Sequence, residues 1–490
     1  MRARVLPRRT AQWHPVSTPP GTPALPDTRV VVVGGGPGGY EAALVARRLG
    51  ADVTVVEEKG LGGSAVLTDV VPSKTLIATA EWMTIADRAP ELGIRGGVGP
   101  EHRHHIDLAA VNTRVKALAA AQSADIRGRL EKEGVRVVLG RGRLDGPQRV
   151  VVDLADGGTQ TTLDADVVLV STGARPRELP EAKPDGERIL TWTQLYDLPA
   201  LPEKLIVVGS GVTGAEFAGA YTSLGADVTL VSSRDRVLPG EDGDAAELIE
   251  QVFKRRGMTV LSRSRAAGAR RTADGVVVTL ADGREVEGSH VLFAVGSIPT
   301  TDGLGLEEAG VRVAPSGHIE VDKVSRTSAR GVYAAGDVTG VLPLASVAAT
   351  QGRIAMSHAL GDAVTPLSLR AVAANIFTAP EIATVGYSEQ RLLDEGTPYE
   401  VSALPIKRNP RAKMLGVREG FVKLFASPGS GTVLGAVLVG PRASESVFPL
   451  SLAITHRLSV DQIADVMTVY PSMSGSLAEV ARTLHHRATD

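Results

Sequence analysis

The amino-acid sequence predicts an α/β protein with two Rossmann-like domains and a separate C-terminal α/β domain. Two observations carry this prediction. A pattern of strand, glycine-rich turn, helix and strand occurs at residues 30–57 and again at residues 205–232. From about residue 368 the pattern changes, and the apolar strands 421–426 and 432–440 lie among helical segments. A chain of 490 residues is long enough for about two to four domains with sizeable cores.

The composition excludes several functional classes. Hydrophobic residues make up 43% of the chain and charged residues 22%, and the formal net charge is -2, so no overall field attracts nucleic acid or an anionic membrane. The absence of cysteine excludes disulfides, thiolate catalysis, iron–sulfur clusters and cysteine-ligated zinc. No apolar run approaches the ~20 residues of a membrane-spanning helix. We therefore expect a soluble, cytoplasmic protein with no nucleic-acid partner and no integral membrane association.

Two segments are not expected to carry chemistry. Residues 1–27 are rich in Pro and Arg and lack the apolar middle of a secretion signal. They are expected to be a disordered extension or an over-long start, with an organelle transit peptide as the alternative. The segment EHRHH at 101–105 has no accompanying carboxylate or fourth-ligand pattern, so we expect a solvated loop and no metal site.

The two βαβ copies match position by position. They read VVVVGGGPGGYEAALVARRLGADVTVVE and LIVVGSGVTGAEFAGAYTSLGADVTLVS. The glycines of the GxGxxG pattern are Gly34, Gly36 and Gly39 in the first copy and Gly209, Gly211 and Gly214 in the second. The first glycine permits a tight turn, the second lets a pyrophosphate approach the backbone, and the third lets the helix pack on the strand. The helix N-terminus then offers N–H donors and positive dipole to the phosphates. Each copy therefore predicts a dinucleotide site.

The residue that ends the second strand distinguishes the two sites. Glu57 is placed to accept hydrogen bonds from a ribose diol. The equivalent residue of the second copy is Ser232, where a carboxylate would have repelled a 2′-phosphate, and Ser233, Arg234 and Arg236 follow it. This arrangement tolerates NADPH and also admits NADH, and the arginines are equally compatible with solvated loop charges.

The remaining strand-and-turn segments set the expected domain order. They are residues 167–176, residues 291–299 and the segment TSARGVYAAGD, which ends at Asp337. The resulting order is an N-terminal extension (1–27), the first part of the first nucleotide domain (28–175), the second nucleotide domain (176–296), the second part of the first domain (297–367) and the C-terminal domain (368–490).

Together these motifs resemble the flavoprotein disulfide reductases, among them lipoamide dehydrogenase and glutathione reductase, over about residues 28–484. The resemblance implies that the first domain binds FAD, that the second binds NADPH or NADH, and that the C-terminal domain forms a homodimer. It implies that these residues hold FAD: Gly34, Gly36, Gly39, Glu57, Gly63, Ser64, Lys74, Thr172, Gly173, Asp337 and Ala345. It implies that these residues hold the nicotinamide nucleotide: Gly209, Gly211, Gly214, Glu216, Ser232, Arg234 and Gly296.

Two of these residues are also candidates for catalysis. Lys74 and Glu216 resemble the family's ion pair beside the flavin N5, where a positive charge favours the reduced cofactor. The alternative is a plain buried structural pair.

The chain departs from the family at its thiol chemistry. The family's motif GGTCLNVGCIPSK corresponds to GGSAVLTDVVPSK at residues 62–74, so Ala65 and Val70 stand where the redox cysteines would be. The family's HPTxxE corresponds to YPSMSG at 470–475, with Tyr470 in place of the histidine and Gly475 in place of the glutamate. Ser346 also replaces a histidine of the family's LAHxA. Disulfide reduction needs thiolate attack, so lipoamide, glutathione and thioredoxin are excluded as direct substrates.

These departures predict that the flavin passes its electrons directly to a diffusible acceptor. A quinone is favoured, bound either in the vacated nicotinamide pocket or on the face formed by Ala65 and Val70. Tyr470 of the second subunit is the expected hydrogen-bond or proton donor near this acceptor. The chain resembles the cysteine-less, lipoamide-dehydrogenase-like NAD(P)H:quinone reductases. The alternatives are a soluble pyridine nucleotide transhydrogenase, whose YPT motif Tyr470 and Pro471 match, and a non-catalytic FAD-binding scaffold or redox sensor.

Overall fold

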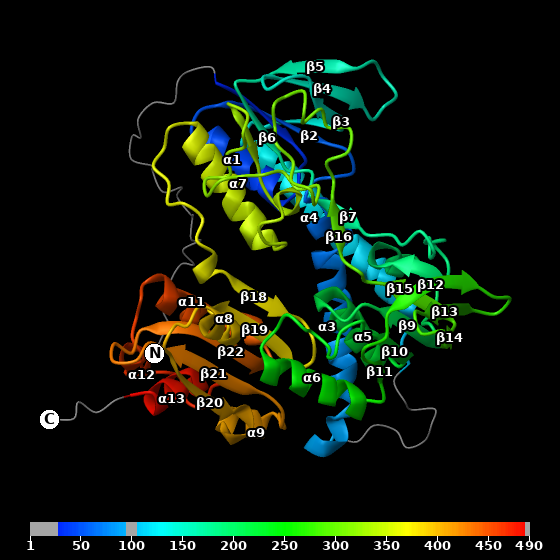
Figure 1. Cartoon of the computed structure of the whole chain (residues 1–490), viewed down its shortest axis with the longest axis vertical. Coiled ribbons are helices and arrows are strands. Elements are labelled where there is room, and N and C mark those ends of the chain that lie inside the picture. Colours follow the sequence, from blue (N-terminus) through cyan, green and yellow to red (C-terminus); the bar gives the residue numbers. More distant parts are fainter. Residues whose placement is uncertain (1–27, 95–104, 486–490) are drawn as a thin grey trace, which may run out of the picture.

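The computed structural model describes residues 28–94 and 105–485. The chain forms three lobes, one above and two side by side below it in Figure 1. Residues 1–27 and most of the segment 101–105 lie outside the described residues, so the expectations for them stay predictions. Within the described ranges, no helix combines the length and apolar character that crossing a bilayer requires.

The first lobe is built on a sheet whose centre is the first βαβ unit. Strand β1 (Arg29–Val33) pairs in parallel with both β2 (Asp52–Glu57) and β6 (Val167–Val170), and nearly all of their side chains are buried. Runs of buried valine are typical of a parallel sheet that is covered on both faces. The seven strands are ordered β17-β6-β1-β2-β3-β4-β5. The other members are β3 (Arg136–Leu144), β4 (Arg149–Leu154), β5 (Thr161–Asp164) and β17 (Val332–Ala334).

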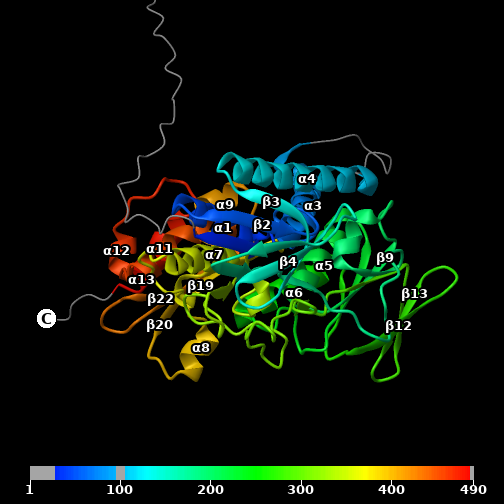
Figure 2. The ribbon, with the colours of Figure 1, turned by 90° about the horizontal axis from the view of Figure 1, so that it is seen from above.

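Helices cover this sheet and extend beyond it. Helix α1 (Pro37–Arg48) lies against α7 (Ala345–Ala359), and a Cβ on Gly352 of α7 would lie 2.0 Å from the carbonyl oxygen of Gly38, so the crossing requires glycine. The segment after β2 forms α2 (Gly63–Leu67), α3 (Val70–Asp87), η1 (Ala89–Leu92) and α4 (Leu108–Lys132). Figure 2 shows α4 along one side of the molecule, beside α3.

The second lobe contains the second βαβ unit in a five-stranded parallel sheet. Its strand order is β11-β10-β9-β15-β8. The strands are β8 (Ile189–Thr191), β9 (Lys204–Val208), β10 (Asp227–Val231), β11 (Thr259–Leu261) and β15 (His290–Phe293). Beside them lie α5 (Val212–Leu224), α6 (Gly243–Arg255), η3 (Trp192–Asp197) and the antiparallel strands β12 (Ala266–Arg271), β13 (Val276–Leu280) and β14 (Glu285–Gly288).

A two-stranded ribbon connects the first two lobes. Strand β7 (Ala174–Pro176) pairs with β16 (Ser297–Pro299), so the chain leaves the first lobe and returns to it through adjacent strands. After the return, η4 (Asp337–Thr339) and α7 complete the first lobe.

The third lobe is a five-stranded antiparallel sheet, ordered β18-β19-β22-β21-β20. The strands are β18 (Ala373–Ile376), β19 (Glu381–Gly386), β20 (Glu400–Pro405), β21 (Phe421–Ala426) and β22 (Val433–Gly440). Around them lie η5 (Leu369–Ala371), η6 (Ile406–Arg408), α8 (Glu389–Asp394), α9 (Pro410–Met414), α10 (Ala443–Ser446), α11 (Phe448–Thr455), α12 (Val460–Ala464) and α13 (Gly475–Thr483). Strands β21 and β22 match the two predicted from the sequence to within one residue.

Candidate active site

The two glycine turns have the shape that a dinucleotide requires. Gly34 and Gly209 have φ of 101° and 111°, and a Cβ at these positions would lie 2.3 Å and 2.2 Å from a carbonyl oxygen of the adjacent strand end. Gly39 and Gly214 bring each helix onto its turn, because a Cβ there would lie 1.9 Å and 1.8 Å from the carbonyl oxygen of the first glycine. Both turns therefore need glycine for backbone reasons.

The middle glycine of each turn differs from the other two. Gly36 and Gly211 precede α1 and α5, and a Cβ on either would meet nothing within 4 Å. Their φ values of -67° and -72° are ordinary for any residue. Space is therefore left open at the N-terminus of each helix, where N–H groups and the helix dipole favour phosphate. This geometry fits one dinucleotide on each unit.

The side chain of Glu57 stabilises the first glycine turn by hydrogen bonds to backbone N–H groups. It is buried at the end of β2, its Oε2 accepts a hydrogen bond from the N–H of Gly35 at 2.6 Å, and its Oε1 accepts one from the N–H of Lys59 at 2.7 Å. A carboxylate has about four acceptor positions, so Glu57 retains the capacity to accept from a ribose hydroxyl. Its role toward FAD stays a prediction.

Ser232 follows directly after β10 and is buried. Its side chain is fully buried, and its hydroxyl bonds the hydroxyl of Ser210 at 2.7 Å and accepts from the N–H of Arg234 at 3.1 Å. Its role toward the nicotinamide nucleotide stays a prediction. The Ser232 hydroxyl holds the start of the loop in which Ser233 and Arg234 are both exposed.

The other predicted FAD residues lie on segments that close around the first turn. A Cβ on Gly63, the first residue of α2, would lie 2.9 Å from the Cα of Gly36, and Ser64 follows it at an exposed position. The hydroxyl of Thr172 donates to the carbonyl oxygen of Thr300 at 2.7 Å.

The remaining predicted positions lie in turns or at the first residue of a helix. Gly173 and Gly296 have φ of 67° and 95°, and a Cβ on either would meet nothing within 4 Å. Asp337 begins η4, where burial raises the pKa of its carboxyl group, and Ala345 begins α7.

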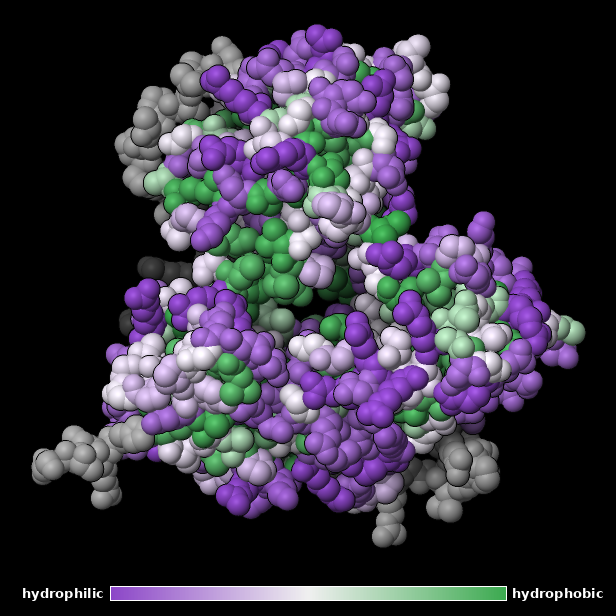
Figure 3. Space-filling model, in the orientation of Figure 1, coloured by the Kyte–Doolittle hydropathy of each residue, from purple (hydrophilic) through white to green (hydrophobic). Residues whose placement is uncertain are grey.

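The structure brings Lys74 and Glu216 together at the junction of the three lobes. Lys74 Nζ lies 2.6 Å from Glu216 Oε2, and Oε1 of the same carboxylate accepts from the N–H of Phe377 at 2.8 Å. Glu216 is 3% exposed and Lys74 is 26% exposed. The ammonium also lies 5.0 Å from the centre of the Phe377 ring. The Glu216 carboxylate thus connects α5 to α3 and to the segment after β18. Figure 3 shows hydrophobic surface at the waist between the lobes.

The two positions of the missing dithiol lie on α2 and α3, two helices of the first lobe that contact each other. Ala65 is half-buried on α2, and Val70, the first residue of α3, is 38% exposed. Between them Asp69 stands where the family motif has glycine, and the sequence analysis did not single it out. Burial raises the pKa of Asp69 to about 6; Lys74 lowers it, and Glu216 and Asp337 raise it. The departure of Asp69 from the family motif was the signal that could have identified it.

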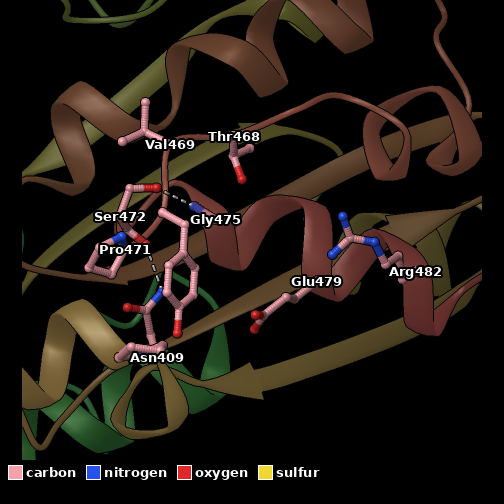
Figure 4. A pocket seen from close by; sticks show the side chains of 10 residues that line it. Asn409, Thr468, Val469, Pro471, Ser472, Gly475, Glu479 and Arg482 are labelled. Carbon is pink, nitrogen blue, oxygen red and sulfur yellow. Dashed lines mark hydrogen bonds between the residues drawn. The ribbon is translucent and has the colours of Figure 1, made fainter.

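Tyr470 lies apart from these residues within one chain. Its side chain is 80% exposed, and no described contact links it to Lys74 or Glu216. It lines a pocket of about 190 Å³ with Asn409, Glu479 and Arg482, shown in Figure 4. No group of three or more His, Asp or Glu side chains that could hold a metal occurs among residues 28–94 and 105–485.

Comparison with known proteins assigns this arrangement to a family. Residues 28–352 match pyridine nucleotide-disulphide oxidoreductases, and residues 372–481 match the dimerisation domain of the same proteins. The chain belongs to the pyridine nucleotide-disulphide oxidoreductase family. The family and the fold class predicted from the sequence are therefore confirmed.

Individual relatives span almost the whole chain. The protein named NAD(P)H dehydrogenase (quinone) from Mycobacterium tuberculosis is 53% identical over 467 residues, covering 93% of this chain and 94% of that protein. Dihydrolipoyl dehydrogenase from Zymomonas mobilis is 32% identical over 464 residues, covering 94% of this chain and 98% of that protein. The crystal structure of LpdA from Mycobacterium tuberculosis has a TM-score of 0.89 at 52% identity and covers 94% of this chain and 100% of that chain.

Within this family the chain keeps both nucleotide units and carries no cysteine. The family's cofactors are FAD and a nicotinamide nucleotide, and the two glycine turns fit them. The hydride-accepting half of the chemistry is therefore present, whereas a redox dithiol is not.

Proposed function

We propose that this protein is an FAD-dependent NAD(P)H:quinone oxidoreductase that acts without a redox dithiol. One observation carries the proposal: both dinucleotide cradles are complete, while the chain has no thiol to receive electrons from a flavin. A quinone is a suitable acceptor because it is flat and takes one or two electrons. The name of the Mycobacterium tuberculosis relative supports the same substrate class. A location in the cytoplasm stays a prediction of the sequence.

The chain's own residues would hold the two nucleotides on either side of the Lys74–Glu216 pair. Helix α1 with Gly36 would receive the FAD pyrophosphate, and helix α5 with Gly211 would receive that of NAD(P)H. FAD, when bound, accepts a hydride from the nicotinamide and passes the electrons to the acceptor. Thr172, Gly173 and Asp337 would close the FAD site.

Lys74 would act by its charge. Its ammonium is held in place by Glu216 at 2.6 Å and is only partly solvated, so it stabilises negative charge more strongly than a solvated lysine would. Glu216 is a positioning residue in this scheme, because both of its oxygens are occupied by Lys74 and by the N–H of Phe377.

We propose a homodimer formed by the third lobe. Residues 372–481 match a dimerisation domain. Large apolar side chains of this lobe are strongly exposed: Phe448 is 64% exposed, Met467 98% and Val469 78%. Exposed apolar surface of this kind favours association, and a two-fold contact uses the same patch on both copies. Tyr470 of one subunit would then approach the Ala65/Val70 face of the other, and sedimentation as a clean monomer would remove Tyr470 from the mechanism.

Two experiments test the function. Anaerobic mixing with NADPH should bleach the flavin absorbance, whereas an unchanged spectrum would favour a scaffold or redox sensor. The reduced protein is then offered menadione, thio-NADP⁺ or lipoamide. Rapid reoxidation by menadione supports the proposal, and preferential reoxidation by thio-NADP⁺ would instead identify a transhydrogenase. Turnover of lipoamide as fast as that of menadione would contradict the absence of thiol chemistry.

Steady-state kinetics locate the acceptor. Ping-pong kinetics are expected if the quinone enters the vacated nicotinamide pocket. A pattern that requires both substrates to be bound together would place the quinone on the Ala65/Val70 face.

A further inference from the structure

Among the residues that the structure describes, the carboxyl group of Asp69 has no hydrogen-bond partner, at a position where an Asp side chain usually has one. Asp69 precedes α3, and an Asp at this position normally accepts a hydrogen bond from the first turn of the helix. Its backbone has φ -127° and ψ -91°, and its side chain makes no capping bond. The backbone is nevertheless fixed, because its N–H donates to the carbonyl oxygen of Ser64 at 2.7 Å and its carbonyl oxygen accepts from Ser73 at 2.8 Å. The backbone of Asp69 is therefore fixed, and no described hydrogen bond occupies its carboxyl group.

Titratable groups from several elements act electrostatically on this carboxyl group. Lys74 lies on its own helix, Glu216 on α5 and Asp337 on η4. Tyr196 belongs to η3 of the second lobe; burial, and after it the charge of Asp69, raises the pKa of that phenol. Tyr196 is 4% exposed, and its hydroxyl has no hydrogen-bond partner within residues 28–94 and 105–485. Helix α2 contributes no ionisable side chain. The cluster is thus one cation, three carboxyl groups and a buried phenol.

Burial and these neighbours together set the pKa of the Asp69 carboxyl group. Burial, the largest effect, raises the pKa of Asp69, and the nearby Lys74 ammonium limits the rise, so that the value lies at about 6. A general acid is most effective when its pKa is close to the working pH. An Asp with its ordinary pKa of about 4 would be almost fully ionised at a pH near 6 and would have little proton to donate.

Reduction of a quinone to a hydroquinone requires two electrons and two protons. The electrons and one proton arrive as a hydride equivalent that originates from NAD(P)H, so a second proton must come from the protein or water. The family's thiols and its histidine, which would carry protons, are replaced here by Ala65, Val70 and Tyr470.

We propose that Asp69 is the catalytic acid of the acceptor half-reaction and donates the second proton to the acceptor oxygen. This proposal rests on the proposed quinone reductase function. The Asp69 O–H bond breaks, an O–H bond forms on the acceptor, and the resulting carboxylate regains a proton from solvent. Lys74 stabilises that carboxylate until it is reprotonated.

The test compares Asp69→Asn with Asp87→Asn in the FAD-loaded protein. Asp87 is the exposed last residue of the same helix and has no described partner, so its variant is a matched control. Reoxidation of the reduced protein by menadione should be about 100-fold slower in Asp69→Asn and unchanged in the control. Ferricyanide accepts electrons without a proton, so its rate should be the same in all three proteins. Equal losses with menadione and ferricyanide would show a structural role and overturn the proposal.

A measurement without turnover follows the same group. The protonated carboxyl group of Asp69 has a C=O stretch that is lost in Asp69→Asn, so a difference infrared spectrum at several pH values titrates it directly. A midpoint near pH 6 is expected. A midpoint at the ordinary pKa of about 4 would overturn the proposal.

The outcomes separate the two levels of the argument. If NADPH bleaches the wild-type flavin but menadione does not reoxidise it, the proposed function fails. If menadione reoxidises wild type and Asp69→Asn equally fast, only the role of Asp69 fails. If Asp69→Asn does not accumulate with FAD bound, Asp69→Ser also lacks the acid and is held to the same expectations.

Discussion

Replacing Lys74 by Met would leave the Glu216 carboxylate buried without a cation. The pair is separated by 2.6 Å, which corresponds to a gross attraction of about 6 kcal/mol at an effective dielectric constant of ~20. Removing one partner of a buried pair costs about 3–5 kcal/mol. Lys74 retains 26% exposure, so we expect the lower end of that range, about 3 kcal/mol in the free energy of unfolding.

An exposed pair of equal length is the control for this prediction. Lys116 and Asp197 are also 2.6 Å apart, but their side chains are 57% and 63% exposed. Lys116→Met should therefore cost less than about 1 kcal/mol. Urea unfolding of the FAD-loaded variants, followed by circular dichroism, measures both losses. Equal losses would show that separation and not burial sets the strength of these pairs, which would refute the reasoning.

The double variant Lys74→Met/Glu216→Gln tests the same cause a second way. It removes the buried charge together with its partner, so it should recover most of the stability lost in Lys74→Met. The single variant should also slow bleaching of the flavin by NADPH. Bleaching at the wild-type rate would leave Lys74 with a structural role only.

Four further predictions follow. Gly211→Ala should raise the KM for NADPH at least about tenfold without changing the melting temperature, because its Cβ would enter open space in front of α5; a loss of stability would contradict this. Arg234→Ala should lower kcat/KM for NADPH relative to NADH, and an unchanged ratio would mean that Arg234 does not meet the 2′-phosphate. Tyr470→Phe should slow reoxidation by menadione while flavin bleaching by NADPH keeps its wild-type rate. If the variant matches wild type in both steps, Tyr470 has no role in the reaction. Asp69→Asn should gain stability relative to wild type between pH 4 and pH 8, measured by urea unfolding. The raised pKa of about 6 means that folded wild type binds the proton more tightly than the unfolded chain, so wild type loses about 2 kcal/mol as the pH rises from 4 to 6. A difference between the two proteins that does not vary with pH would contradict the assigned pKa.

Local patterns in the sequence were sufficient for the nucleotide-binding units. The segment 30–57 became β1, α1 and β2 with almost the predicted ends, because buried valines favour a parallel strand and the glycine positions are dictated by backbone contacts within the unit. The same holds for residues 205–232. The strands of the third lobe were harder to predict from the sequence. Strands β18, β19 and β20 are short or partly exposed, and they lack a strong alternation of apolar and polar residues.

The sequence by itself determined the family, the two dinucleotide units and the loss of thiol chemistry, because these depend on residue identity and spacing along the chain. Only the tertiary structure decided which side chains share an environment. It buried Ser232 against Ser210 and the N–H of Arg234, and it enclosed Glu216 between Lys74 and Phe377. It also surrounded Asp69 with groups from three other segments of the chain. Burial and electrostatic coupling depend on such tertiary contacts: Glu216 lies 142 positions from Lys74 and 161 from Phe377, and no local pattern records contacts of this kind.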